Sequence, residues 1–281
     1  MRFKKASIVF GVVIIVLLLL IVFSVSNILN RGTEEVKVAK EFIEELYDSG
    51  IIEENNIIKD AVVQEEALNK LANKNSRIKY SVIVGNYGVD IDKNYKVLGF
   101  SNKNLGEKKY KSEEEVSEEE AIYLAKSYIS EITEEDFTFK YINLKEDDKS
   151  LVYNVVFNKL KDGYPCYDQE INTLINKVTG KLEAYTNYTL DDIKYINQIN
   201  IDEMEATETL EKNIKNLKLN INIEGSPILG YINISDKEMG LAYIFNIKIT
   251  SNDNKEEIFK SFVRADTGEI INSNLEAVSR E

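Results

Sequence analysis

The side chains that could do chemistry in this sequence are carboxylates, lysines, tyrosines and one thiol. The chain contains no histidine, which excludes Ser–His–Asp and Cys–His catalysis and imidazole metal ligands. Cys166 is the one cysteine, so an intramolecular disulfide and a Cys₂His₂ or Cys₄ zinc site are excluded. Because a nucleophilic thiol needs a base beside it, we interpret Cys166 as a half-buried strand residue.

Acidic residues are numerous enough to form many accidental pairs. The chain has 48 Asp and Glu residues, whereas glycoside hydrolysis needs two carboxylates held about 5 to 9.5 Å apart. The runs Glu113–Glu115 and Glu118–Glu120 are better explained as a solvated helix start, where the dipole favours negative charge. The acidic turns 146–150 and 251–257 lack the spacing of an EF-hand Ca²⁺ loop. The sequence therefore predicts no enzyme, no catalytic or metal-binding residue and no cofactor.

The charge balance argues against one class of partner. The net charge is −13, and residues 31–281 hold 32 basic against 48 acidic side chains. Such a surface repels phosphate backbones, so we expect no nucleic-acid partner.

The first thirty residues predict a membrane anchor. Ala6–Leu29 comprises 24 residues without a charge, and about 20 apolar residues cross the hydrocarbon core of a bilayer. Arg2, Lys4 and Lys5 precede this segment, which favours a cytoplasmic N-terminus and an extracellular remainder. The alternative is a cleaved signal peptide, whose apolar region is usually only about 7 to 15 residues long. We predict an uncleaved single-pass protein of the cell membrane, anchored through residues 6–29.

A helix and four strands are predicted between residues 117 and 187. Ser117 and Glu120 form a capping-box pattern, and apolar residues then recur at helical spacing as far as Ile132. Period-two alternation follows in four segments, near residues 137–141, 151–157, 171–175 and 182–186. A turn at Thr179-Gly180 calls for positive φ at Gly180. The pattern predicts one helix packed on an antiparallel four-stranded meander.

The same order of elements recurs. A helix pattern that includes Ala206 follows Ala121 by 85 residues, and the turn glycine Gly268 follows Gly180 by 88. A degenerate copy lies upstream, with a helix near 34–50, a second helix over 56–76 and a hairpin over 80–102 that turns at Asp92-Lys93-Asn94. We therefore predict an α+β fold, in which an N-terminal transmembrane helix precedes tandem helix-plus-sheet units. The predicted divisions are a cytoplasmic stub and anchor (1–30), a degenerate unit (31–105) and two full units (106–198 and 199–281).

These motifs resemble a known repeat. The stretch "VSEEEAIYLAKSYI", followed by "KDGYPCYDQEINTLINKVTGKLEAY", resembles a PepSY unit, most closely the tandem PepSY-like proteins of the YcdB/YcdC and YpeB-like families of spore-forming Gram-positive bacteria. The last unit keeps Thr267, Gly268 and Ile270 of the turn motif. The family's usual turn Asp is replaced by Asn176 in one copy and by Arg264 in the other. The resemblance is good over residues 110–281 and loose over 34–105.

The resemblance implies a function without catalysis. PepSY-like units are associated with regulation of proteases and with envelope and germination factors. We therefore expect a membrane-anchored extracytoplasmic binding or regulatory protein of the cell envelope, with a protein partner there. The alternatives are an accessory regulator of a membrane sensor kinase, like the YycH/YycI type, and, less favoured, an envelope hydrolase that uses Asp or Glu.

Two further features bear on binding. Tyr153, Tyr185 and Tyr243 fall in strand patterns and are expected in the core or on sheet faces, with a Tyr-lined groove as the alternative. The stretch 225–240 is long and apolar and ends at a turn near Ser235. We interpret it as one more strand of the sheet. The alternative is an edge strand that pairs with a partner, with Lys237 guarding against self-association.

Overall fold

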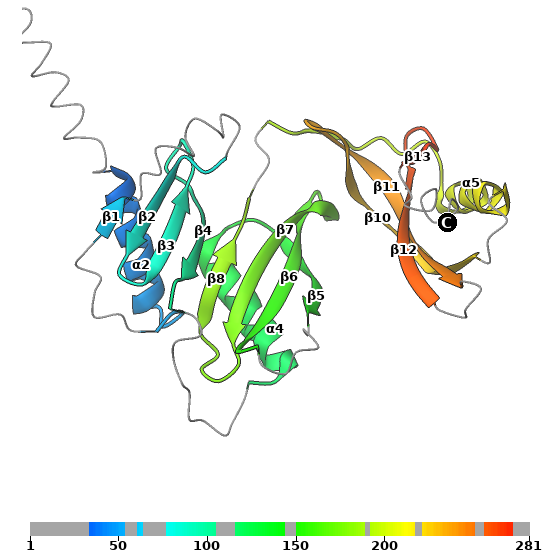
Figure 1. The fold of residues 1–281 in the computed structure, drawn as a ribbon. Coiled ribbons are helices and arrows are strands. Elements are labelled where there is room, and N and C mark those ends of the chain that lie inside the picture. Colours follow the sequence, from blue (N-terminus) through cyan, green and yellow to red (C-terminus); the bar gives the residue numbers. More distant parts are fainter. Residues whose placement is uncertain are drawn as a thin grey trace, which may run out of the picture. The chain divides into compact units, whose positions relative to one another are not determined.

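The computed structural model of the chain describes residues 34–53, 61–63, 77–104, 116–143, 150–188, 192–216, 221–250 and 256–271. The chain divides into two compact units, 1–109 and 110–281. Helices and mostly antiparallel strands build both units (Figure 1), so the fold class is α+β as predicted. No helix within the described ranges is long and apolar enough to span a membrane, and the predicted anchor over 6–29 lies outside them. The predicted domain divisions stay predictions.

The described residues of the first unit form one helix and a four-stranded antiparallel meander. Helix α2 spans Glu34–Asp48 and buries Ala39, Ile43 and Leu46, the apolar face that the sequence pattern predicts. The strands pair in sequence order and are β1 (Ala61–Val63), β2 (Tyr80–Val84), β3 (Tyr87–Ile91) and β4 (Val97–Asn102).

One expectation for this unit is wrong and another is incomplete. Residues 56–76 are expected to be helical, but Ala61–Val63 form β1, because pairing with Val82–Val84 of β2 outweighs a weak helical spacing; the neighbouring residues 56–60 and 64–76 lie outside the described ranges. The hairpin predicted over 80–102 does turn after Asp92, between β3 and β4, where the N–H of Asp92 donates to the carbonyl of Lys96 at 2.9 Å. Its first arm is divided, since Gly85 has a φ of +58° and turns the chain between β2 and β3.

The second unit begins with the predicted helix and meander. Ser117 caps α4 (Glu118–Ile132), its hydroxyl accepting a hydrogen bond from the backbone N–H of Glu120 at 3.2 Å. The strands are β5 (Phe137–Asn143), β6 (Val152–Lys161), β7 (Tyr164–Asn176) and β8 (Leu182–Thr186). They pair antiparallel in that order, which confirms the predicted meander.

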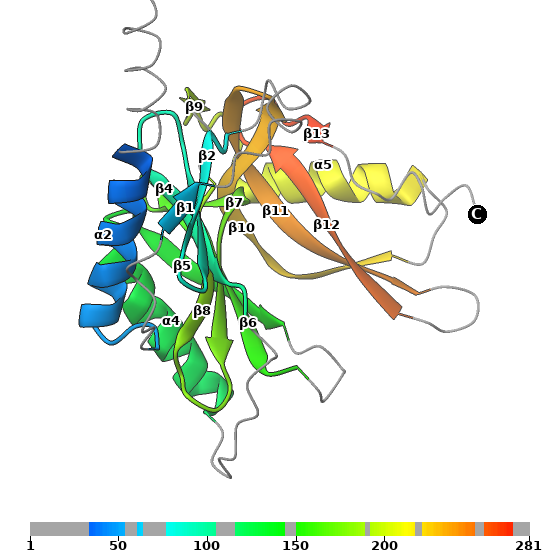
Figure 2. The same ribbon diagram turned by 60° about the vertical axis from the view of Figure 1, so that its left-hand side comes forward.

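A second helix and meander complete this unit (Figure 2). The elements are β9 (Lys194–Ile196), α5 (Glu203–Asn216), β10 (Ile221–Ser235), β11 (Glu238–Thr250), β12 (Glu256–Arg264) and β13 (Ile270–Ile271). β10 to β13 pair antiparallel in order, while β9 pairs parallel with β11. β10 confirms that residues 225–235 form one more strand of the sheet. It also forms one parallel bridge to β7, between Tyr231 and Cys166.

The two Thr-Gly turns have the same geometry. Gly180 and Gly268 have φ values of +67° and +73°, as predicted. The N–H of Gly180 donates to the carbonyl of Asn176, and the N–H of Gly268 donates to that of Arg264, both at 2.9 Å. Asn176 replaces the aspartate of the motif directly, because its Oδ1 accepts from the N–H groups of Val178 and Thr179. Shared hydrogen bonds therefore support the internal repeat.

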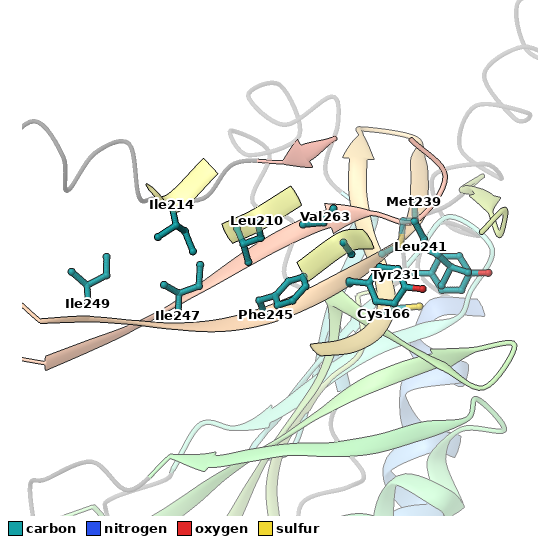
Figure 3. Close-up of a cluster of buried hydrophobic side chains, with 13 residues drawn as sticks. Cys166, Leu210, Ile214, Tyr231, Met239, Leu241, Phe245, Ile247, Ile249 and Val263 are labelled. Carbon is teal, nitrogen blue, oxygen red and sulfur yellow. The ribbon is translucent and has the colours of Figure 1, made fainter. Parts of the chain in front are cut away.

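The core between α5 and its sheet is apolar and continuous (Figure 3). Ala206, Leu210 and Ile214 of α5 pack against β11 and β12. Alternate residues of β11 face the helix: Leu241, Tyr243, Phe245, Ile247 and Ile249. Because strand side chains alternate between faces, the remaining residues of β11 face away from α5.

Candidate functional site

The face of β10–β12 turned away from α5 carries the most distinctive group of side chains in the second unit. Register places Ile228 beside Ile244, Ile244 beside Phe262, and Asn246 beside Lys260. We call this surface the distal face and define it by Ile228, Ile244, Asn246, Ile258, Lys260 and Phe262.

Part of the distal face is apolar and exposed. Ile228 and Ile258 expose 58% and 64% of their surface, whereas Ile232, Ala242 and Ile244 on the same face are buried. An isolated exposed isoleucine is ordinary. Ile228 pairs with Ile244 of the buried cluster and so extends its apolar surface to solvent. Ile258 is a second exposed apolar group on this face, opposite Lys248 and beyond the pair of Asn246 and Lys260.

A bulge in β7 covers the buried part of this face. Pairing between β6 and β7 passes from Asn158–Glu170 to Lys159–Cys166, which leaves residues 167–169 outside the ladder. Tyr167 from this bulge packs edge-on against Phe262, with ring centroids 5.1 Å apart. Gly230 permits the close approach, because a Cβ there would lie 2.8 Å from the Pro165 carbonyl oxygen.

Lys140 connects β5 to the same surface. Its Nζ lies 4.4 Å from the centroid of the Tyr167 ring and 2.6 Å from Oε1 of Glu170. It therefore combines a cation–π contact with an ion pair. Desolvation by burial raises the pKa of Tyr167, so its hydroxyl stays protonated at neutral pH.

Lys260 lies at the centre of the distal face and has an unusual environment. Among the described residues, its ammonium donates to the side-chain oxygen of Asn246, a neutral amide. Burial and the nearby positive charge of Lys140 both lower its pKa. Lys248 on the same face is different, because its Nζ lies 2.6 Å from Glu256 and 3.8 Å from Glu224. The hydrogen bond to Glu256 raises the pKa of Lys248. Lys260 thus carries a charge that no carboxylate in the described part of the chain neutralises.

Cys166 lies in strand β7, as predicted, but it is fully buried and not half-buried. It is 1% exposed and belongs to the core between α5 and its sheet. Burial raises the pKa of its thiol to about 11, which leaves almost no nucleophilic thiolate at neutral pH. The nearby Lys159 forms an ion pair with Glu135 at 2.9 Å.

The other residues considered from sequence do not gather at one place. Glu118–Glu120 form the first turn of α4, as expected for a dipole-matched helix start. Tyr153, Tyr185 and Tyr243 are buried, which confirms their assignment to the core or sheet faces. Most of the two acidic turns, residues 144–149 and 251–255, lies outside the described ranges. No cluster of three or more potential metal ligands occurs in the described segments.

Comparison with known proteins finds similarity in structure, but none to a family model or a curated sequence. Among solved structures, the chain is similar to the YpeB C-terminal domain of Bacillus megaterium, with 15% sequence identity and a TM-score of 0.47. The alignment covers 76% of this chain and 90% of that domain.

Proposed function

We propose that the chain is a membrane-anchored, extracytoplasmic binding protein that uses the distal face to dock a protein partner in the cell envelope. The observation that carries this proposal is the exposure of Ile228 and Ile258 on a sheet face whose other side is covered by α5. Burying an exposed isoleucine stabilises a complex by about 1.5 to 3 kcal/mol. The two residues give this face two exposed apolar contacts, which a protein interface buries.

The aromatic residues beside the face fit the same function. Tyr141 exposes 42% of its surface and Tyr167 is half-buried. Interfaces are enriched in such residues, because a tyrosine contributes apolar area and a polar end at small entropic cost. No step of this function requires a catalytic group.

The class of partner follows from the sequence. The uncharged segment 6–29 and its basic flank favour attachment to the outer side of the membrane. The resemblance to tandem PepSY-like proteins favours regulation of a protease, or of an envelope or germination enzyme. Under this proposal, the long strands β10 and β11, joined by the two-residue turn Asp236-Lys237, present the distal face on a rigid scaffold.

Site-specific photocrosslinking tests the docking surface. A photoreactive phenylalanine analogue is placed at Ile258 or Ile228 of the full chain in intact cells, and crosslinked proteins are identified by mass spectrometry. The matched control is Tyr123 of α4, which is 72% exposed and lies on a helix surface. We expect one shared partner at positions 258 and 228 that is absent at 123. Identical patterns at all three positions, or none, would contradict the proposal.

A further inference from the structure

The distal face of β12 shows a regular chemical pattern. Ile258, Lys260 and Phe262 follow one another at every second residue, so all three side chains are on the same face of the strand. Neighbouring members are separated by about 7 Å along the strand. The strand thus presents an apolar, a cationic and an apolar group in a row.

The positive charge at the centre of this row, on Lys260, lacks a neutralising carboxylate among the described residues. An ammonium has three donors, and among the described residues that of Lys260 donates to the Asn246 amide. A partly buried charge is disfavoured until an opposite charge approaches it. Placing an uncompensated lysine between two apolar groups therefore favours an anionic ligand.

We propose that the distal face binds an extended acidic segment of a protein partner, in which a carboxylate follows an apolar residue by two positions and precedes another by two. The carboxylate pairs with Lys260, and the two apolar side chains cover Ile258 and the part of the Tyr167–Phe262 pair that stays exposed. An extended peptide matches this row because its own side chains repeat with the same period. This inference rests on the proposed function and specifies the chemistry of its docking surface.

The acidic character of the chain does not oppose this pairing. Charges farther away than about 8 to 10 Å are largely screened at physiological ionic strength. Lys260 acts locally, and Lys140 adds positive potential at its ammonium. A carboxylate is favoured over a phosphate, because a single uncompensated charge flanked by apolar groups suits a monoanion with apolar neighbours.

The test uses the full chain in mild detergent and a labelled peptide that repeats Ile-Thr-Glu-Thr, followed by fluorescence anisotropy. The Glu peptide should bind about tenfold more tightly than its Gln counterpart, as expected for a hydrogen bond to a charged group. Lys260→Met, which keeps the aliphatic stem, should remove that preference. The matched control Lys248→Met changes a lysine that is already paired with Glu256 and should retain it.

Several outcomes would overturn the assignment. Equal binding of the Glu and Gln peptides, or an unchanged preference in Lys260→Met, would show that Lys260 does not recognise a carboxylate. If inorganic phosphate displaces the Glu peptide more strongly than acetate does at the same concentration, the site would be assigned to phosphate instead. Photocrosslinking from Ile258 distinguishes a failure of the carboxylate assignment from a failure of the docking proposal. If Lys260→Met keeps the crosslinked partner, docking stands and the carboxylate assignment falls; if the parent chain gives no position-specific partner, docking itself falls.

Discussion

The Thr-Gly turns of the two meanders provide a matched pair of substitutions. Both glycines have positive φ, where a residue with a β-carbon is strained by roughly 1 kcal/mol. Their surroundings differ. A Cβ on Gly180 would lie 2.9 Å from Cδ1 of Leu124 on α4, whereas a Cβ on Gly268 would lie at an ordinary 3.7 Å from Ile201. Gly180→Ala should therefore destabilise more than Gly268→Ala.

The expected magnitudes follow from these contacts. Gly268→Ala should lose about 1 kcal/mol of unfolding free energy from backbone strain alone. Gly180→Ala should lose about 2 kcal/mol, because Leu124 must also leave its preferred rotamer, which costs roughly 0.5 to 1.5 kcal/mol. Since the second unit spans residues 110–281, each kcal/mol corresponds to a fall in Tm of about 2 to 4 °C.

Urea unfolding followed by circular dichroism measures both variants. A double-mutant cycle with Leu124→Ala isolates the contact, since the extra loss in Gly180→Ala should shrink when Leu124 is truncated. Equal losses at the two glycines would show that Leu124 does not limit the site. Unchanged stability in both variants would refute positive φ at these turns.

Three further substitutions test other parts of the second unit. Hydrogen bonding to Arg264 lowers the pKa of Asp266, so the Asp266 carboxylate stabilises the fold above about pH 4. Asp266→Asn should therefore lower Tm at pH 7. The difference in Tm between variant and parent should vanish as the pH falls through the native pKa of Asp266. The buried thiol of Cys166 should react with a thiol reagent at pH 8 only after denaturant is added, and rapid reaction of native protein would contradict its burial. Ile228→Lys should leave Tm within about 1 to 2 °C of the parent while abolishing partner crosslinking at Ile258; Ile232→Pro, at a buried strand position, should instead unfold the unit.

The helices and long strands were predictable because their periods are strong. The capping pattern at Ser117 and the alternation around β6, β7 and β11 each extend over many residues. β9 was not predictable in the same way, because Lys194–Ile196 is too short to show a period. Its pairing with Glu238–Gly240 depends on the folded position of β11. The bulge in β7 likewise leaves no mark in the sequence, since residues 167–169 look like a continuation of the strand.

The candidate site was missed for a different reason. A lysine that alternates with apolar strand residues is normally interpreted as solvent-facing, so Lys260 gave no signal. Its environment is set by two residues distant in sequence. The register of β11 and β12 places Asn246 beside it, and Lys140 of β5 brings a second positive charge near it. Neither can be read from the local pattern.

The internal repeat allows the distal-face residues of β12 to be compared with their counterparts in β7. Because Gly180 and Gly268 occupy the same turn position, residues of β7 and β12 correspond at a separation of 88. Ile258, Lys260 and Phe262 thus correspond to Glu170, Asn172 and Leu174. On the helix-facing side the two strands share apolar residues, Ile171 with Phe259 and Ile175 with Val263, with a hydroxyl residue between them, Thr173 or Ser261. The opposite face differs: in β7 the acidic member is already paired with Lys140, whereas in β12 the row is apolar around a lysine. Packing accounts for what the two copies share, and under our proposal the binding chemistry lies in what differs, the distal face of the last meander.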